Sequence, residues 1–155
     1  MRIGWLAVLC AFFLASAVAD HGVILLYHHV DEETPASTSV TPAQFSAHLD
    51  YIENNGFVVV PLDELLDGVF GSGDVPDNAV AITFDDAYES VYSTAFPELA
   101  ARGMPFAVFV ATDAVDQGYA ATLSRAQLRE LHDSGLASIG AHSRTHEHLL
   151  RGSEQ

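Results

Sequence analysis

The chain has 155 residues and carries 21 acidic against 6 basic side chains, for a formal net charge of −15. A surface this negative repels phosphate backbones, so we expect no nucleic-acid binding. The length suffices for one domain with its own hydrophobic core.

Residues 1–19 have the pattern of a secretory signal peptide. A short basic start precedes the apolar run 3–14, and Ala17-Val18-Ala19 offers a small-x-small cleavage site. The rival interpretation is a retained membrane anchor, which needs roughly 20 apolar residues, more than this run supplies. We therefore expect cleavage after Ala19, export to the periplasm, cell envelope or extracellular space, and no stable membrane span in the mature chain, 20–155.

The single cysteine, Cys10, lies within the predicted signal peptide. The mature chain would then have no disulfide bond, although it is exported. Any metal ion would have to be bound by nitrogen and oxygen atoms.

Strand-like and helix-like segments alternate about five times along the rest of the chain. Short apolar runs predict strands at residues 21–27, 57–60, 79–84, 105–110 and 136–141. The strands at 21–27 and 79–84 are expected to be buried. Helical spacing of apolar residues predicts helices between them, at about residues 42–54, 62–70, 88–102 and 124–134. This alternation is typical of a parallel α/β architecture.

Local signals mark where several of these helices begin or break. Thr41 to Gln44 and Ser124 to Gln127 have the capping-box pattern of a helix start. Pro97 lies inside the pattern at 88–102 and should kink or restart that helix. Helix 62–70 is expected to turn Leu66 and Val69 inward, and the polar segment 31–40 is expected to be a loop.

Four polar side chains follow directly from the predicted strands: His28, Asp85, Asp86 and His142. Barrels and open α/β sheets both place their active sites at the carboxyl ends of strands. Neighbouring side chains in a strand point to opposite faces, so Asp85 and Asp86 would reach one pocket from different directions. Two adjacent carboxylates repel unless a cation or hydrogen-bond donors neutralise them. The plain alternative is that one aspartate caps the following helix and the other is solvated.

His142 and His146 are four residues apart. If the chain turns helical after the last strand, this spacing places both imidazoles on one side. Two histidines and one carboxylate can hold a metal ion and leave positions open for water and substrate. A third histidine, His148, is interpreted as a bystander, and Ser143 is expected to brace the loop.

These residues resemble a known family. Thr83-Phe84-Asp85-Asp86 and His142-Ser143-Arg144-Thr145-His146 are similar to the first two motifs of the polysaccharide deacetylases, the NodB-homology group of carbohydrate esterase family 4. Tyr27-His28-His29-Val30 resembles the opening strand of the exported branch that acts on poly-N-acetylglucosamine or peptidoglycan-like polymers. The resemblance runs from about Gly22 to Leu150.

The resemblance implies a distorted (β/α) barrel, of which this chain holds the first five or so strand–helix units. It implies that Asp85 is the general base and that Asp86, His142 and His146 bind a divalent metal, usually zinc. The implied substrate is an N-acetylated glycan polymer. His28 is expected either to contact this substrate or to make a structural hydrogen bond.

The resemblance is incomplete, because the later motifs of the family are not found before Gln155. These motifs supply an arginine that orients the base, a Trp-lined acetyl pocket and a histidine that acts as general acid. A barrel without its last strands is expected to expose an open edge, and this chain alone is expected to turn over little substrate.

Two alternatives to a metal-dependent deacetylase stay open at this point. One is a non-catalytic carbohydrate-binding or assembly protein that retains a truncated deacetylase barrel. The other is a different metallohydrolase with the same ligands, such as a phosphatase, which the acidic surface disfavours.

Overall fold

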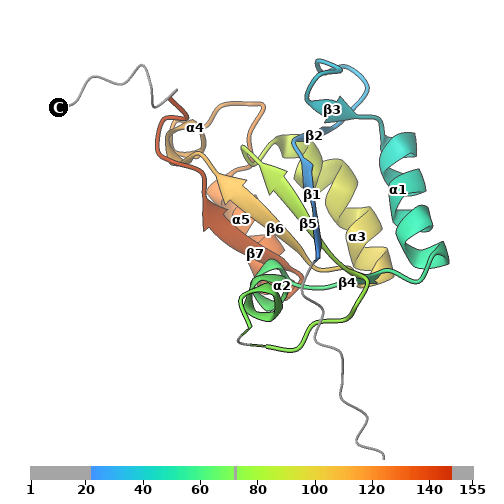
Figure 1. The fold of residues 1–155 in the computed structure, drawn as a ribbon. Helices are drawn as coiled ribbons and strands as arrows, with labels where there is room; N and C mark the ends of the chain where they lie inside the picture. Colours follow the sequence, from blue (N-terminus) through green and yellow to red (C-terminus); the bar gives the residue numbers. More distant parts are fainter. Residues whose placement is uncertain (1–21, 72, 148–155) are drawn as a thin grey trace, which may run out of the picture.

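The computed structural model describes residues 22–71 and 73–147 (Figure 1). Its main sheet is parallel and has the strand order β1-β5-β6-β7. These strands are β1 (Val23–Tyr27), β5 (Ala79–Asp85), β6 (Phe106–Val110) and β7 (Ala137–Ala141). A short strand, β4 (Val58–Val59), pairs with the beginning of β5. The predicted parallel α/β architecture is therefore confirmed.

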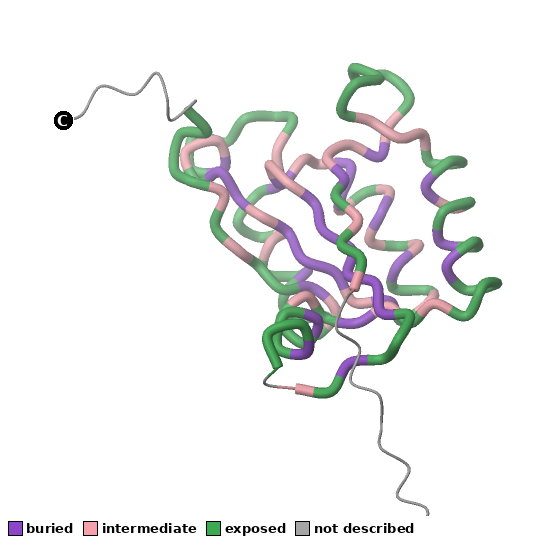
Figure 2. The backbone as a smooth tube through the Cα atoms, viewed as in Figure 1, coloured by how far each residue is buried: buried purple, intermediate pink, exposed green. Residues whose placement is uncertain are grey.

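Strand β5 forms the centre of the core (Figure 2). Its first six residues are buried and only its last, Asp85, is partly exposed. The Phe84 ring packs against Tyr27, Phe45 and Phe106, at centroid distances of 5.6, 6.0 and 5.8 Å. An uninterrupted apolar run suits a strand that is covered on both faces, and this run delivers the two aspartates at its carboxyl end.

Helices α1 (Pro42–Asn54) and α5 (Arg125–Asp133) begin where their sequences predict. The Thr41 and Ser124 side chains each accept a hydrogen bond from a backbone N–H three residues later, and both capping boxes are complete. Helix α1 buries Phe45, Leu49 and Ile52. Helix α2 (Leu62–Val69) buries Leu65, but Leu66 and Val69 are exposed, so the expectation that these two face inward is wrong.

The single helix predicted at 88–102 is two elements. A π-helical segment, η1 (Val91–Ala95), leads into α3 (Phe96–Arg102). Pro97 lies in the first turn of α3, where a missing N–H costs no helical hydrogen bond, so the prediction of a restart is confirmed. Helices α3 and α1 lie side by side (Figure 1), joined by ion pairs from Arg102 to Asp50 and Glu53.

Three further elements were not predicted. Strands β2 (His29–Val30) and β3 (Ser39–Val40) pair in parallel, so part of the expected loop 31–40 is a strand. A short helix, α4 (Thr112–Asp116), follows β6. All three elements are too short to leave a periodic pattern in the sequence.

The sheet is open within the described residues, with β1 at one edge and β7 at the other. Edge strand β1 exposes the apolar side chains of Val23, Ile24 and Leu26, the last of them 56% exposed. Ile139 of β7 is exposed at the opposite edge. This agrees with a partial barrel. No helix in the described part of the chain is long and apolar enough to cross a membrane.

Candidate metal centre

The carboxyl ends of β5 and β7 bring Asp86, His142 and His146 together, although β6 separates the two strands. One ligand atom from each residue lies within 4.8 Å of the other two. The Asp86 Oδ1 atom is 3.6 Å from His142 Nε2 and 3.4 Å from His146 Nε2. The centroids of the two imidazole rings are 4.9 Å apart. These are the three residues expected to bind a metal.

A left-handed turn directs Asp86 toward the same site as Asp85. Strand β5 ends at Asp85, and the next two residues, Asp86 and Ala87, have φ angles of 67° and 53°. This backbone conformation is rare for residues other than glycine and costs of order 1–3 kcal/mol. Asp85 also lies beside His142, with its Oδ2 atom 3.9 Å from His142 Nε2. The turn therefore interrupts the alternation of strand side chains, and both carboxylates lie near the same imidazole.

The segment from His142 to His146 is a loop, so the helical turn considered for this spacing is not formed. Instead, Ser143 and His146 adopt left-handed conformations, with φ angles of 62° and 55°. The backbone N–H of His146 donates to Ser143 Oγ over 3.0 Å, which confirms the expected bracing role of Ser143. His148 lies outside the described residues.

The Asp86 carboxylate has an unusual environment. Its side chain is 13% exposed, and its Oδ1 atom is buried without a hydrogen-bond donor among the described residues. A buried carboxylate oxygen in this state is costly, and a cation placed between Oδ1 and the two imidazole nitrogens would remove that cost. Three nitrogen and oxygen ligands with room for further ligands suit a catalytic divalent ion such as zinc.

Tyr88 lies beside this site, although no motif in the sequence indicates a role for it. Its pKa is raised, first by burial and then by the charge of Asp86 and a hydrogen bond to that carboxylate. Its ring stacks on the imidazole of His29 at a centroid distance of 3.5 Å. Burial lowers the pKa of His29, and the charge of Asp31 opposes this shift.

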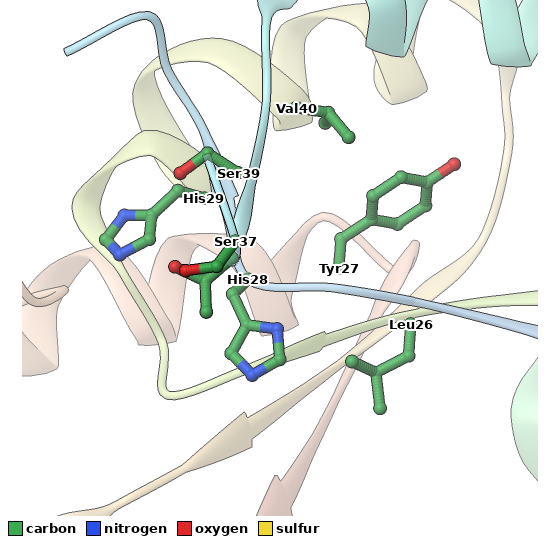
Figure 3. Close-up of a pocket in the computed structure, with 8 residues that line it drawn as sticks. Leu26, Tyr27, His28, His29, Ser37, Ser39 and Val40 are labelled. Carbon is green, nitrogen blue, oxygen red and sulfur yellow. The ribbon is translucent and has the colours of Figure 1, made fainter. Parts of the chain in front are cut away.

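His28 lies at the carboxyl end of β1 and lines a cavity of about 250 Å³ (Figure 3). The rest of the lining comes from β1, β2, β3 and the residues just before β3, and it includes three residues with hydroxyl side chains, Ser37, Thr38 and Ser39. His28 and His29 point in different directions (Figure 3). His28 is not one of the three clustered groups, so its expected contact with substrate remains a hypothesis.

Comparison with known proteins places this arrangement in a family. The family model described as "Polysaccharide deacetylase" matches residues 72–155, more than half of the chain. The poly-beta-1,6-N-acetyl-D-glucosamine N-deacetylase of Escherichia coli K12 is 27% identical over 138 residues, and that of Staphylococcus epidermidis is 26% identical over 152 residues. These matches cover 78% and 87% of this chain.

Solved structures give the same result. The structure of IcaB from Ammonifex degensii superposes with a TM-score of 0.73 at 33% identity, covering 78% of this chain. A Streptococcus pyogenes deacetylase, solved in complex with acetate, superposes with a TM-score of 0.75 at 26% identity and covers 84% of this chain.

The matches also differ from this chain in length. The chain spans 20% of the E. coli relative and 52% of the S. epidermidis relative. It covers 52% and 60% of the two solved structures. The architecture, with its open sheet, corresponds to part of a NodB-type barrel. The chain belongs to the polysaccharide deacetylase family.

Proposed function

We propose that this protein is a metal-dependent hydrolase that removes N-acetyl groups from an extracellular polysaccharide containing N-acetylglucosamine. The observation that carries the proposal is the buried Oδ1 atom of Asp86, which has no hydrogen-bond partner among the described residues and faces two imidazole nitrogens. Relatives named as poly-N-acetylglucosamine deacetylases support the substrate class.

In this proposal Asp86, His142 and His146 hold the cation, with zinc the expected ion. A bound zinc ion would polarise the acetyl carbonyl group and lower the pKa of water. Asp85 acts as the general base. Its carboxylate lies beside the three ligands without belonging to them and is 14% exposed, so it is free to accept a proton from the attacking water. Water adds to the acetyl carbon as Asp85 takes one of its protons, the C–N bond breaks as a proton passes to the nitrogen, and acetate and a free amine on the sugar result.

Removing the metal should abolish the activity. We expect slow release of acetate from oligomers of N-acetylglucosamine by this chain, no release after treatment with a chelator, and recovery of the slow release when zinc is added back. The measurement is enzymatic detection of acetate. Asp85→Asn should lower the rate by about 10²–10⁴-fold, the usual contribution of a positioned base.

The matched control is Glu64→Gln, which removes one exposed carboxylate on α2, near the opposite end of the strands (Figure 1). It should leave the rate unchanged. Acetate release that survives complete metal removal, or that Asp85→Asn does not reduce, would contradict the proposal.

We further propose that His28 contacts the glycan. The imidazole lines a cavity rich in hydroxyl groups at the same end of the sheet as the metal centre. His28→Ala should therefore raise the KM for N-acetylglucosamine oligomers several-fold, while zinc content stays that of the wild type. An unchanged KM would leave His28 a structural residue.

We also propose that the protein is located outside the cytoplasm. Its chain would consist of a signal peptide, 1–19, and a partial deacetylase domain, 20–155. Residues 1–19 lie outside the described part of the chain. Mass spectrometry of the exported protein should find a mature amino terminus at Asp20. Exported protein that retains Met1 would show that this segment is not removed.

A further inference from the structure

We propose that Asp113 and Arg144 are positioning residues that hold the loop 142–146 in the shape that presents His142 and His146 to the cation. The inference rests on the proposed function, because it concerns the same metal centre. It adds two residues from outside the ligand set, one of them on α4, that control the affinity of the site.

The first observation is a set of backbone hydrogen bonds that continues beyond the ends of β6 and β7. The N–H of His142 donates to Val110 O over 2.8 Å. The N–H of Thr112 then donates to Ser143 O over 3.4 Å, and that of Asp113 donates to Arg144 O over 2.9 Å. Two consecutive residues at the start of α4 are thus hydrogen-bonded to two consecutive residues of the loop.

The second observation is a side-chain bond between the last two residues of this set. Arg144 Nε donates to Asp113 Oδ1 over 2.9 Å. Two hydrogen bonds therefore join these residues, one donated by the backbone N–H of Asp113 and one donated by the side chain of Arg144. The Asp113 side chain is 25% exposed and that of Arg144 is 80% exposed.

The loop needs such a restraint. Ser143 and His146 are held in left-handed conformations, which relaxed chains seldom populate. The His146 side chain is 58% exposed, so packing restrains it little. A looser loop would spend less time in the ligand-presenting shape, and the apparent Kd for metal rises by the same factor. An exposed ion pair contributes little to global stability, so the effect should appear in metal affinity.

The experiment compares zinc Kd values, measured by competition with a chromophoric chelator, for the full chain and three variants. Asp113→Asn and Arg144→Gln should each raise the Kd about two- to fivefold, the range expected for losing an exposed ion pair. The zinc Kd of the double variant should be no higher than the higher of the two single-variant values, because each substitution removes the same interaction. The Tm of the metal-free protein should stay the same in all of them.

The control is Arg125→Gln, which breaks the ion pair between Arg125 and Asp116, a residue on the same short helix that makes no hydrogen bond to the loop among the described residues. It should leave the zinc Kd unchanged. A wild-type Kd for Asp113→Asn, or fully additive effects in the double variant, would overturn the inference. So would an unchanged Kd for Arg144→Gln combined with a raised KM for glycan, because Arg144 would then be a substrate ligand.

A second measurement does not depend on metal binding. Without zinc, the amides of His142 and His146 should exchange hydrogen faster in Asp113→Asn than in the wild type, and at the wild-type rate in Arg125→Gln. Unchanged exchange overturns the positioning role. If the wild-type chain binds no zinc and this exchange difference is still found, the proposed function fails while the restraint on the loop stands.

Discussion

Asp86→Ala is expected to abolish zinc binding, whereas Asp85→Asn is expected to retain it. Asp86 supplies the buried oxygen that lies within 3.6 Å of both imidazole nitrogens. Asp85 lies at the edge of the group, 3.9 Å from His142 and outside the set of three. Loss of a residue that hydrogen-bonds directly to a metal ligand weakens metal binding about 10–100-fold, so loss of a ligand should exceed that. Zinc content of the purified variants, measured by mass spectrometry, tests this.

The same measurement on His142→Ala and His146→Ala should give the Asp86→Ala result. Circular dichroism of each metal-free variant provides the control for folding. If Asp85→Asn loses zinc as completely as Asp86→Ala does, Asp85 is a metal ligand and its proposed role as the general base is wrong.

The second large effect concerns stability. Phe84→Ala should lower the free energy of unfolding by about 3–5 kcal/mol, the usual cost of deleting a buried aromatic ring. Phe84 is fully buried and contacts aromatic rings from β1, α1 and β6. Because its neighbours come from three elements, the cavity left behind cannot close by a shift of one of them. Urea unfolding followed by fluorescence measures the change.

Phe70→Ala is the matched control, because Phe70 is 79% exposed. This substitution should change the free energy of unfolding by no more than about 0.5 kcal/mol. Equal effects of the two substitutions would mean that β5 is not the centre of the core. Phe84 directly precedes Asp85, so a loss of packing here would also displace the candidate site.

Much of the fold could be predicted because its signals are local. The capping boxes at Thr41 and Ser124 depend on residues three positions apart, and both helices begin there. The apolar run into Asp85 identified the central strand for the same reason. Leu66 and Val69 show the limit of this reasoning. A helical pattern says which side chains share a face, but only the tertiary structure says whether anything covers that face.

The residues of the candidate site could be named from the sequence, but their geometry could not. The left-handed backbone conformations of Asp86, Ala87 and His146 could not be predicted, because no glycine marks these positions in the sequence. The restraint by Asp113 depends on a contact across 31 residues, which no local pattern encodes. The π-helical segment before Pro97 could not be predicted either, because a proline indicates a break in a helix but not the type of helix that precedes it.

The most direct test of the account is a crystal structure of the zinc-loaded protein with anomalous diffraction data collected at the zinc edge. The account predicts one strong peak about 2.0–2.2 Å from Asp86 Oδ1, His142 Nε2 and His146 Nε2. Asp85 should lie next to the ion without coordinating it. A zinc ion held instead by His28 and His29, or no peak at the ends of β5 and β7, would contradict the central claim.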